Sequence, residues 1–484
     1  MDFDYIVIGA GASGLAFTAL MGQKGFRVGL CESHSLVGGC SSYFERQGYL
    51  FDAGATTLAG LLPGRPLHQL IEALDLKLDL KKVDPGITFV FNDKKIKRFS
   101  NEEKWLAELA KYFPEINHEL IGSKIASVNE LGWLLSTKFS HIPIENMKDL
   151  LTFLTPDILS ALKTLPHLLT SVENSLGLRE LQNKDYLAMI NELLFITAQN
   201  TMSDTPMLMG AMGLNYPNDT FYAMGGMKAF CQALSAKCSN LFLRHKVLSI
   251  KKINNGFEVT TSKNIFTTKK IVSTLPIWNH SRLFSDPTIK RKFSQKEKKE
   301  SKVEDCWSAF MIYLTIPNDL DRSGQYFQIH CDSIPHCHSK SFFVSLSHPE
   351  DKLRDLSGKN TRQTVTISTH TKSSSWLDLP THVYKERKSE TEKFILDHLC
   401  QSLKIKRDDL ENIMTGSPST FIRYTNRHKG LVGGIPHSLK RNPINYLISS
   451  APLKDFYLLG DTQFPGQGIA AVVLGAQNLV KRLT

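Results

Sequence analysis

The residues of this chain that are best spaced for chemistry are three glycines near its start. Gly9, Gly11 and Gly14 follow the apolar run Tyr5-Ile-Val-Ile8, and Ser13 stands among them. In a strand–turn–helix pattern of this kind, the first glycine allows a tight turn and the second lets the backbone approach a pyrophosphate. The third lets the helix pack closely on the strand. The pattern predicts a dinucleotide site, but alone it does not distinguish NAD, NADP and FAD.

A second group of residues follows soon afterwards and narrows that choice. Glu32 ends the next apolar run, where a carboxylate accepts hydrogen bonds from ribose hydroxyls and repels a 2′-phosphate, which disfavours NADP. A glycine pair beyond it would let a second loop lie against the pyrophosphate. Small residues further on would let the backbone pack against a flat isoalloxazine ring. The predicted contacts are Gly38, Gly39, Cys40 and Ser41 in the first loop, and Gly54, Ala55 and Thr56 in the second.

The end of the chain has a matching signature. An apolar run at residues 456–459 leads into a Gly-Asp pair, and a predicted helix opens shortly afterwards. Signatures at both ends indicate one long cofactor held by the whole chain, and they predict tight, noncovalent FAD. Backbone N–H groups at that helix N-terminus would stabilise the negative charge of the reduced ring. The predicted contacts are Gly460, Asp461, Gln467, Gly468 and Ile469, and Val247 at the start of a predicted strand.

Two other groups of residues could do chemistry. His330-Cys331 and His336-Cys337-His338 supply soft ligands, but their spacing matches no standard zinc site, so we expect no metal. Arg423 and Arg427, with the loop 430–434 and His437, could border a substrate near the flavin or equally anchor a sheet edge. The sequence identifies no catalytic residue, no dithiol near the flavin segments and no second glycine fingerprint for NAD(P)H.

The elements that would position these residues predict an α/β fold. A strand, a helix and a second strand over 5–32, followed later by an antiparallel meander, are expected of an FAD-binding Rossmann-like domain of the glutathione-reductase type. This domain would comprise residues 1–65, 221–290 and 450–484. A discontinuous α+β substrate domain would comprise residues 66–220 and 291–449, and its first part is predicted to be rich in helices.

The boundaries of the predicted substrate-domain elements follow from hydrophobic periodicity. Helices are expected over 67–78, 101–112, 116–133, 146–154, 156–169, 184–197 and 385–402. Strands are expected over 307–315, 326–330, 342–347 and 363–369.

Composition bears on the partners of the protein. The formal net charge of +11 favours anionic partners, but no nucleic-acid-binding module is present, so we expect no nucleic acid. Residues 147–178 are rich in Leu and Phe and could dip into a membrane, line a lipid tunnel or form plain core. Eight scattered cysteines, the lack of a signal peptide and the lack of a long apolar run predict a cytoplasmic protein. Its basic charge suggests peripheral contact with the inner face of an anionic membrane.

The motifs at both ends resemble those of the phytoene desaturase and carotenoid isomerase family. The similar segments are Gly38-Gly-Cys-Ser-Ser, Phe51-Asp-Ala-Gly-Ala, Gly433-Gly434 and Gly460-Asp-Thr-Gln-Phe-Pro-Gly-Gln-Gly-Ile. The branch that looks most similar is the carotenoid 3,4-desaturase type, which is akin to retinol saturases. The resemblance implies an FAD-dependent oxidoreductase that acts on a long apolar polyene drawn from a membrane. Hydride would pass to flavin N5, and a quinone or oxygen would reoxidise the flavin.

Two alternatives share the same frame. A flavin amine oxidase would need an aromatic cage facing the flavin, and covalent attachment through a C-terminal Cys is excluded because residues 460–479 contain none. A prenyl-lipid carrier of the Rab GDP-dissociation-inhibitor type would use no flavin. The intact glycines and Glu32 argue against the carrier.

Overall fold

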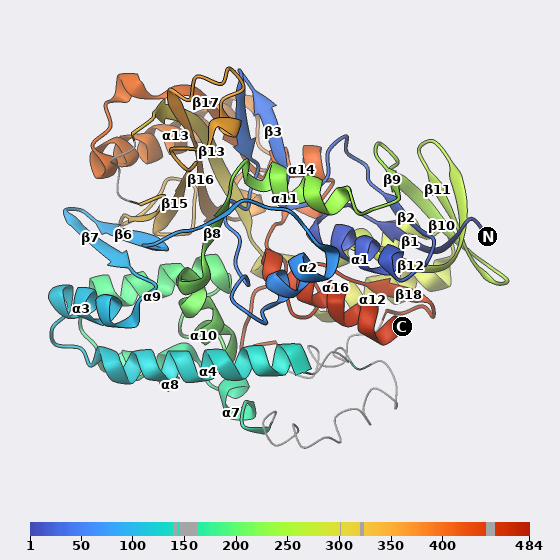
Figure 1. Ribbon diagram of the computed structural model, residues 1–484, viewed down its shortest axis with the longest axis horizontal. Helices are drawn as coiled ribbons and strands as arrows, with labels where there is room; N and C mark the ends of the chain where they lie inside the picture. The colour runs from blue at the N-terminus through green and yellow to red at the C-terminus, as the bar shows by residue number, and fades with distance from the viewer. Residues whose placement is uncertain (139–143, 145–161, 301, 320–323, 442–450) are drawn as a thin grey trace.

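The computed structural model describes residues 1–138, 144, 162–300, 302–319, 324–441 and 451–484. Within these residues, strands form two seven-stranded sheets and two small two-stranded sheets. The two large sheets lie side by side, with both chain termini close to the first sheet (Figure 1). A layer of helices lies along the second sheet.

The first sheet joins the start, the middle and the end of the chain. Its strand order is β10-β11-β12-β1-β2-β9, and β18 pairs with β12. β1 runs parallel to β2, β12 and, through β12, to β18. The strands are β1 (Phe3–Ile8), β2 (Val28–Cys31), β9 (Asn240–Phe242), β10 (Val247–Ile253), β11 (Gly256–Thr261), β12 (Ile265–Ser273) and β18 (Phe456–Leu458).

Both faces of this sheet are covered, which is why β1 is apolar along its length. Tyr5 and Val7 pack among the helices of one face, whereas Ile6 and Ile8 pack with the meander and α12 on the other. The helices of the first face are α1 (Ala12–Gln23), α2 (Pro66–Leu74), α11 (Gly226–Ser235) and α16 (Ile469–Leu483), and α12 spans Pro287–Glu300. Two small antiparallel pairs lie beside them: the hairpin of β3 (Tyr43–Arg46) with β4 (Tyr49–Asp52), and the pair of β5 (Leu80–Lys82) with the distant β8 (Phe221–Ala223).

The second sheet has the order β17-β13-β16-β15-β14-β6-β7. Its central pairs are antiparallel, and only β14 and β6 run parallel. The strands are β6 (Ile87–Phe91), β7 (Lys94–Arg98), β13 (Ser308–Pro317), β14 (Tyr326–His330), β15 (Ser341–Leu346), β16 (Arg362–Thr371) and β17 (Glu411–Gly416). The long helix α13 (Thr381–Leu403) packs on this sheet, and α14 (Pro418–Thr425) follows β17.

The helical layer forms a separate apolar core with β6 and β7. It consists of α3 (Glu102–Tyr112), α4 (His118–Lys138), α7 (Leu165–Leu169), α8 (Val172–Ser175), α9 (Lys184–Thr197) and α10 (Met207–Asn215). In Figure 1 the long helix α4 lies along the edge of this layer, away from the second sheet.

Most of the predicted elements occur in the structure. The predicted helix-rich segment also contains the β6–β7 hairpin, whose strands meet at Asn92-Asp93. Residues Ile265–Ser273 form one strand, β12, which belongs both to the predicted antiparallel meander and to the parallel part of the first sheet. The predicted helix 146–154, residues 156–161 of the predicted helix 156–169, and residues 147–161 of the Leu- and Phe-rich segment lie outside the described residues. Since each large sheet combines distant parts of the chain, we propose the two discontinuous domains with the boundaries predicted from the sequence.

Candidate functional site

The first glycine turn joins β1 to the N-terminus of α1. A β-carbon added to Gly14 would lie 2.1 Å from the carbonyl oxygen of Gly9, so only glycine lets this helix pack so closely. Gly9 has a φ of +99°, which also favours glycine. At Gly11 an added β-carbon would meet no atom within 4 Å. Gly11 therefore faces open space at the start of α1, where backbone N–H groups can bind a phosphate.

The second glycine loop lies directly against the first. Gly38 N–H donates to the carbonyl of Ala10 at 2.8 Å, and Gly38 forms a β-bridge with Gly11. A β-carbon on Gly39 would come 3.3 Å from Gly11 Cα. Ser41 Oγ donates to the Gly38 carbonyl and holds the loop closed. The two loops together form a backbone cradle beside the open space at Gly11.

Glu32 stands at the end of β2, at the rim of this cradle. One carboxylate oxygen accepts the N–H of Ala10 at 2.8 Å, and the other accepts the N–H of His34 at 2.8 Å. Ser33 Oγ donates to the second oxygen at 3.1 Å. Each carboxylate oxygen can accept further bonds. The side chain is therefore fixed with acceptor capacity to spare, as a ribose contact requires.

The segment after β4 brings small residues to the same cavity. A β-carbon on Gly54 would lie 2.5 Å from the carbonyl of Cys40, so this position also requires glycine. Ala53, Gly54, Ala55 and Thr57 line the cavity, whereas Thr56 does not. The Thr56 hydroxyl instead hydrogen-bonds Ser345 in the second sheet.

The closing segment meets the cradle from the C-terminal side. Arg427, predicted either to border the substrate or to anchor a sheet edge, is buried and pairs with Asp461 at 2.6 Å. A β-carbon on Gly434 would lie 2.1 Å from the Asp461 carbonyl, which explains the glycine at this loop position. Gln199, with a φ of +56°, lines the cavity nearby, and its buried Oε1 has no partner within the described residues.

These segments enclose one cavity of about 1320 Å³. This exceeds the usual volume of a pocket for one drug-sized ligand, so it has room for both a dinucleotide and a substrate. Of the predicted contacts, all line the cavity except Gly14, which packs beneath the turn, and Thr56. Those that line it are Gly9, Gly11, Ser13, Glu32, Gly38, Gly39, Cys40, Ser41, Gly54, Ala55, Val247, Gly460, Asp461, Gln467, Gly468 and Ile469. We call the part formed by these residues the polar half.

The other part of the cavity is formed by residues that the sequence did not point to. Trp133 and Leu135 come from α4, Leu208, Met209 and Met212 from α10, and Met311 from β13. We call this part the apolar half. In the sequence, the helical residues of the apolar half show only an ordinary helical periodicity. That periodicity does not distinguish residues that line a cavity from residues that pack in a core.

Polar groups within the described cavity wall are mostly uncharged or paired. Burial lowers the pKa of His370 and of His437 to about 4, so both imidazoles are neutral at physiological pH. Tyr216 lines the cavity and hydrogen-bonds Thr57, and burial raises its pKa to about 12. His370, His437 and Tyr216 therefore present no charge to an apolar molecule in the cavity.

The Cys- and His-containing segment lies away from the cavity. His330 is buried and stacks on Phe91 with ring centroids 3.9 Å apart, while His336 pairs with Glu390 at 2.9 Å. In the described part of the chain, no three His, Cys, Asp or Glu side chains come together as ligands for a metal. Among the described helices, none combines the length and the apolar character needed to cross a bilayer.

Comparison with known proteins agrees with this geometry. The sequence profile of the family described as flavin containing amine oxidoreductase matches residues 12–412. The chain is 24% identical to prolycopene isomerase 1, chloroplastic, of an Oncidium hybrid cultivar, over 100% of this chain and 84% of that protein. It is 23% identical to all-trans-retinol 13,14-reductase of Danio rerio, over 100% of this chain and 87% of that protein.

Among solved structures, wild-type putrescine oxidase bound to putrescine superposes with a TM-score of 0.66 at 14% identity, covering 100% of this chain and 99% of that one. The predicted α/β fold with an FAD-binding Rossmann-like domain is confirmed, as is the predicted cofactor, FAD. The resemblance to phytoene desaturases and carotenoid isomerases is also confirmed. The backbone cradle, the fixed Glu32 carboxylate and the unpartnered Gln199 oxygen fit such a cofactor.

Proposed function

We propose that this chain, which belongs to the flavin-containing amine oxidoreductase family, is an oxidoreductase whose substrate is a long apolar polyene. Desaturation, saturation and isomerisation are the three candidate reactions. The observation that supports the substrate class is the apolar half of the cavity, formed by Trp133, Leu208, Met209 and Met212 among others. The names of the relatives, prolycopene isomerase and retinol reductase, point to molecules of this kind.

The chain's own residues would bind and orient, while FAD, when bound, supplies hydride chemistry at N5. The polar half would hold the dinucleotide: the glycine loops the pyrophosphate, Glu32 the ribose, and residues 467–469 the pyrimidine end of the ring. The apolar half would align a C–H bond or double bond of the polyene with the ring and exclude water. A polyene offers no ionisable group, so neutral His370 and His437 suit the wall.

The alternative of an amine substrate is less well supported. Four carboxylates line the described cavity wall, and each already has a donor. Glu32 accepts two backbone N–H groups and Glu45 pairs with Lys228 at 2.7 Å. Asp219 accepts the N–H groups of Gly60 and Leu61, and Asp461 pairs with Arg427. An ammonium group would have to compete with these donors at each of the four carboxylates.

The test is anaerobic mixing of the FAD-loaded protein with carotenoids, retinoids and a diamine, each presented in the same detergent micelle. A desaturase would bleach the oxidised flavin with a polyene. A saturase would reoxidise dithionite-reduced flavin, and an isomerase would change the polyene isomer with reduced flavin and no net turnover. Bleaching by the diamine, with every polyene left unchanged in both flavin states, would refute the proposal.

We also propose that the protein contacts an anionic membrane to collect such a substrate, and that a quinone or oxygen reoxidises the flavin. The basic surface supports this contact, since α12 alone contains Lys290, Arg291, Lys292, Lys296, Lys298 and Lys299. Flotation with anionic vesicles should recover the protein, and recovery should fall as salt rises because screening weakens surface charge attraction. Equal recovery with neutral vesicles would contradict the contact.

A further inference from the structure

A row of four hydroxyl side chains crosses the second sheet. Tyr313 of β13 pairs in register with Thr366 of β16, and Thr366 pairs with Ser345 of β15. Ser345 in turn pairs with Tyr326 of β14. Residues directly opposite each other on antiparallel strands point to the same face. The four buried hydroxyls, which we call the hydroxyl row, therefore face the same side of four consecutive strands.

The hydroxyl row binds the segment that follows β4. Each of its members makes one contact with residues 52–56. Thr366 Oγ1 donates to the Asp52 carbonyl at 3.2 Å, Tyr313 donates to the Ala53 carbonyl at 2.6 Å, Tyr326 donates to the Thr56 carbonyl at 3.1 Å, and the Ser345 and Thr56 hydroxyls bond at 2.7 Å. Burial raises the pKa of Tyr313 and Tyr326, so both remain hydrogen-bond donors.

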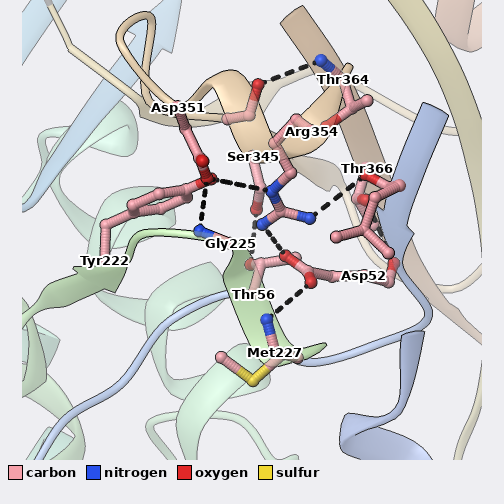
Figure 2. Close-up of polar contacts among 12 residues, drawn as sticks. Asp52, Thr56, Tyr222, Gly225, Met227, Ser345, Asp351, Arg354, Thr364 and Thr366 are labelled. Carbon is pink, nitrogen blue, oxygen red and sulfur yellow. Dashed lines mark hydrogen bonds and ion pairs between the residues drawn. The ribbon is translucent and has the colours of Figure 1, made fainter. Parts of the chain in front are cut away.

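A buried ion pair fixes the start of the same segment. Figure 2 shows the Arg354 guanidinium between Asp52, at 2.6 Å, and Asp351, at 3.4 Å. Tyr222 accepts from Arg354 Nε at 2.8 Å and donates to Asp351 at 2.6 Å. The backbone N–H of Met227 donates to the other Asp52 oxygen at 2.9 Å. Buried charges of this kind are tolerated only when their hydrogen bonds are satisfied, as they are here.

The same contacts explain a glycine pair that the sequence contains at the return to the first sheet. The Gly225 N–H donates to Asp351 at 2.8 Å. A β-carbon on Gly226 would lie 1.9 Å from a terminal nitrogen of Arg354, so the guanidinium occupies the space of a side chain. The ion pair therefore connects three parts of the chain: the end of β4, the start of α11 and the loop around residue 351.

We propose that the hydroxyl row and the Asp52–Arg354 pair are positioning residues for the flavin ring. Thr366, Ser345 and Tyr326 hold residues 52–56 from outside the cavity, which Ala53, Gly54 and Ala55 line, whereas Tyr313 also lines the cavity. The second sheet also contributes Met311 and His370 to the cavity wall. It thereby fixes the position of the flavin ring relative to the substrate. The inference rests on FAD and on the expected contact of Gly54 and Ala55 with the ring, and it does not depend on the polyene.

The experiment compares matched hydroxyl deletions in the FAD-loaded protein. Tyr313→Phe removes a donor to residues 52–56, whereas Tyr384→Phe removes a partly buried hydroxyl contact with Ser417 elsewhere in the proposed substrate domain. Thr366→Val removes the donor to Asp52, and Thr366→Ser retains the hydroxyl. The readouts are the visible circular dichroism of bound FAD, its reduction potential and its dissociation constant, none of which requires a substrate.

Tyr313→Phe and Thr366→Val should change the flavin dichroism and potential and weaken FAD binding by about three- to tenfold, the effect of one hydrogen bond. Tyr384→Phe and Thr366→Ser should match the wild type. Unchanged dichroism and potential in both deletion variants would overturn the proposal. If Thr366→Val does not fold, the Thr366→Ser variant still tests the proposal. It keeps the hydroxyl, so an altered flavin spectrum in this variant would also overturn the proposal. Altered dichroism without reaction on any polyene would refute only the proposed substrate.

Discussion

The polar half and the apolar half of the cavity differ in which atoms form them. In the polar half, backbone atoms lie at the surface, and glycines at 9, 38 and 54 let neighbouring segments approach one another. In the apolar half, the wall includes the Trp and Leu side chains of α4 and the Leu and Met side chains of α10. Substitutions should therefore act by steric exclusion in the polar half and by a change of polarity in the apolar half.

The largest effect should come from Gly14, which lies beneath the polar half. Gly14→Ala should destabilise the protein by about 3 kcal/mol or more, because its β-carbon would overlap the Gly9 carbonyl. Gly22 is the matched control, since it lies in the same helix and a β-carbon there meets nothing within 4 Å. Gly22→Ala should gain up to about 1 kcal/mol. Denaturant unfolding measures both variants, and equal stabilities would show that α1 does not need this close contact.

Gly11 should separate cofactor binding from folding. Its φ of −70° is open to any residue, and its β-carbon would point into the free space of the cradle. Gly11→Val should therefore unfold as the wild type does but bind FAD about 100-fold more weakly, because its methyl groups would overlap the pyrophosphate. Fluorescence titration with FAD, together with thermal unfolding of the apoprotein, measures the two effects. Wild-type affinity would place the pyrophosphate elsewhere.

Glu32 tests the part of the polar half that depends on a side chain. Glu32→Ala should weaken FAD binding by about 1–3 kcal/mol, the usual loss for a hydrogen bond to a charged group. Glu32→Gln keeps one acceptor oxygen and should lose less. Because Glu32 also holds Ala10 and His34, the unfolding midpoint of each apoprotein must be measured beside the affinity. Unchanged affinity in Glu32→Ala would mean that the ribose does not lie at this carboxylate.

The polar half was predictable from the sequence because its backbone geometry requires particular residue types. Gly9, Gly38 and Gly460 have positive φ values, and Gly14 and Gly54 have no room for a β-carbon. Such requirements place glycines at fixed spacing within one short segment, and this pattern can be recognised in the sequence. The same logic explains why Thr56 was assigned to the ring side: it lies next to Gly54 and Ala55, but its hydroxyl turns to Ser345 in a strand far along the chain.

The substrate-domain hairpin, the buried ion pair and the apolar half of the cavity could not be predicted, because they depend on contacts between distant segments. The β6–β7 hairpin was missed because β7, Lys94-Lys-Ile-Lys-Arg98, is mostly basic, and because β14, the second partner of β6, is more than two hundred residues away. The pairing of Asp52 with Arg354 spans a similar separation. The wall formed by Met209 and Met212 resembles an ordinary core face until the fold shows which residues line the cavity.

The smallest expected effect tests the apolar half through two methionines. Met209 and Met202 are both half-buried and pack against the same apolar core, but only Met209 lines the cavity. Met209→Gln should place an amide where a polyene must lie, and desolvating that amide costs about 1 kcal/mol, equivalent to a several-fold rise in KM for an apolar substrate. FAD affinity should not change, because the polar half is untouched. Met202→Gln should alter stability to a similar extent with no effect on KM. If the two variants behave alike towards the substrate, the wall formed by α10 does not contact it, and the substrate must enter the cavity by another side.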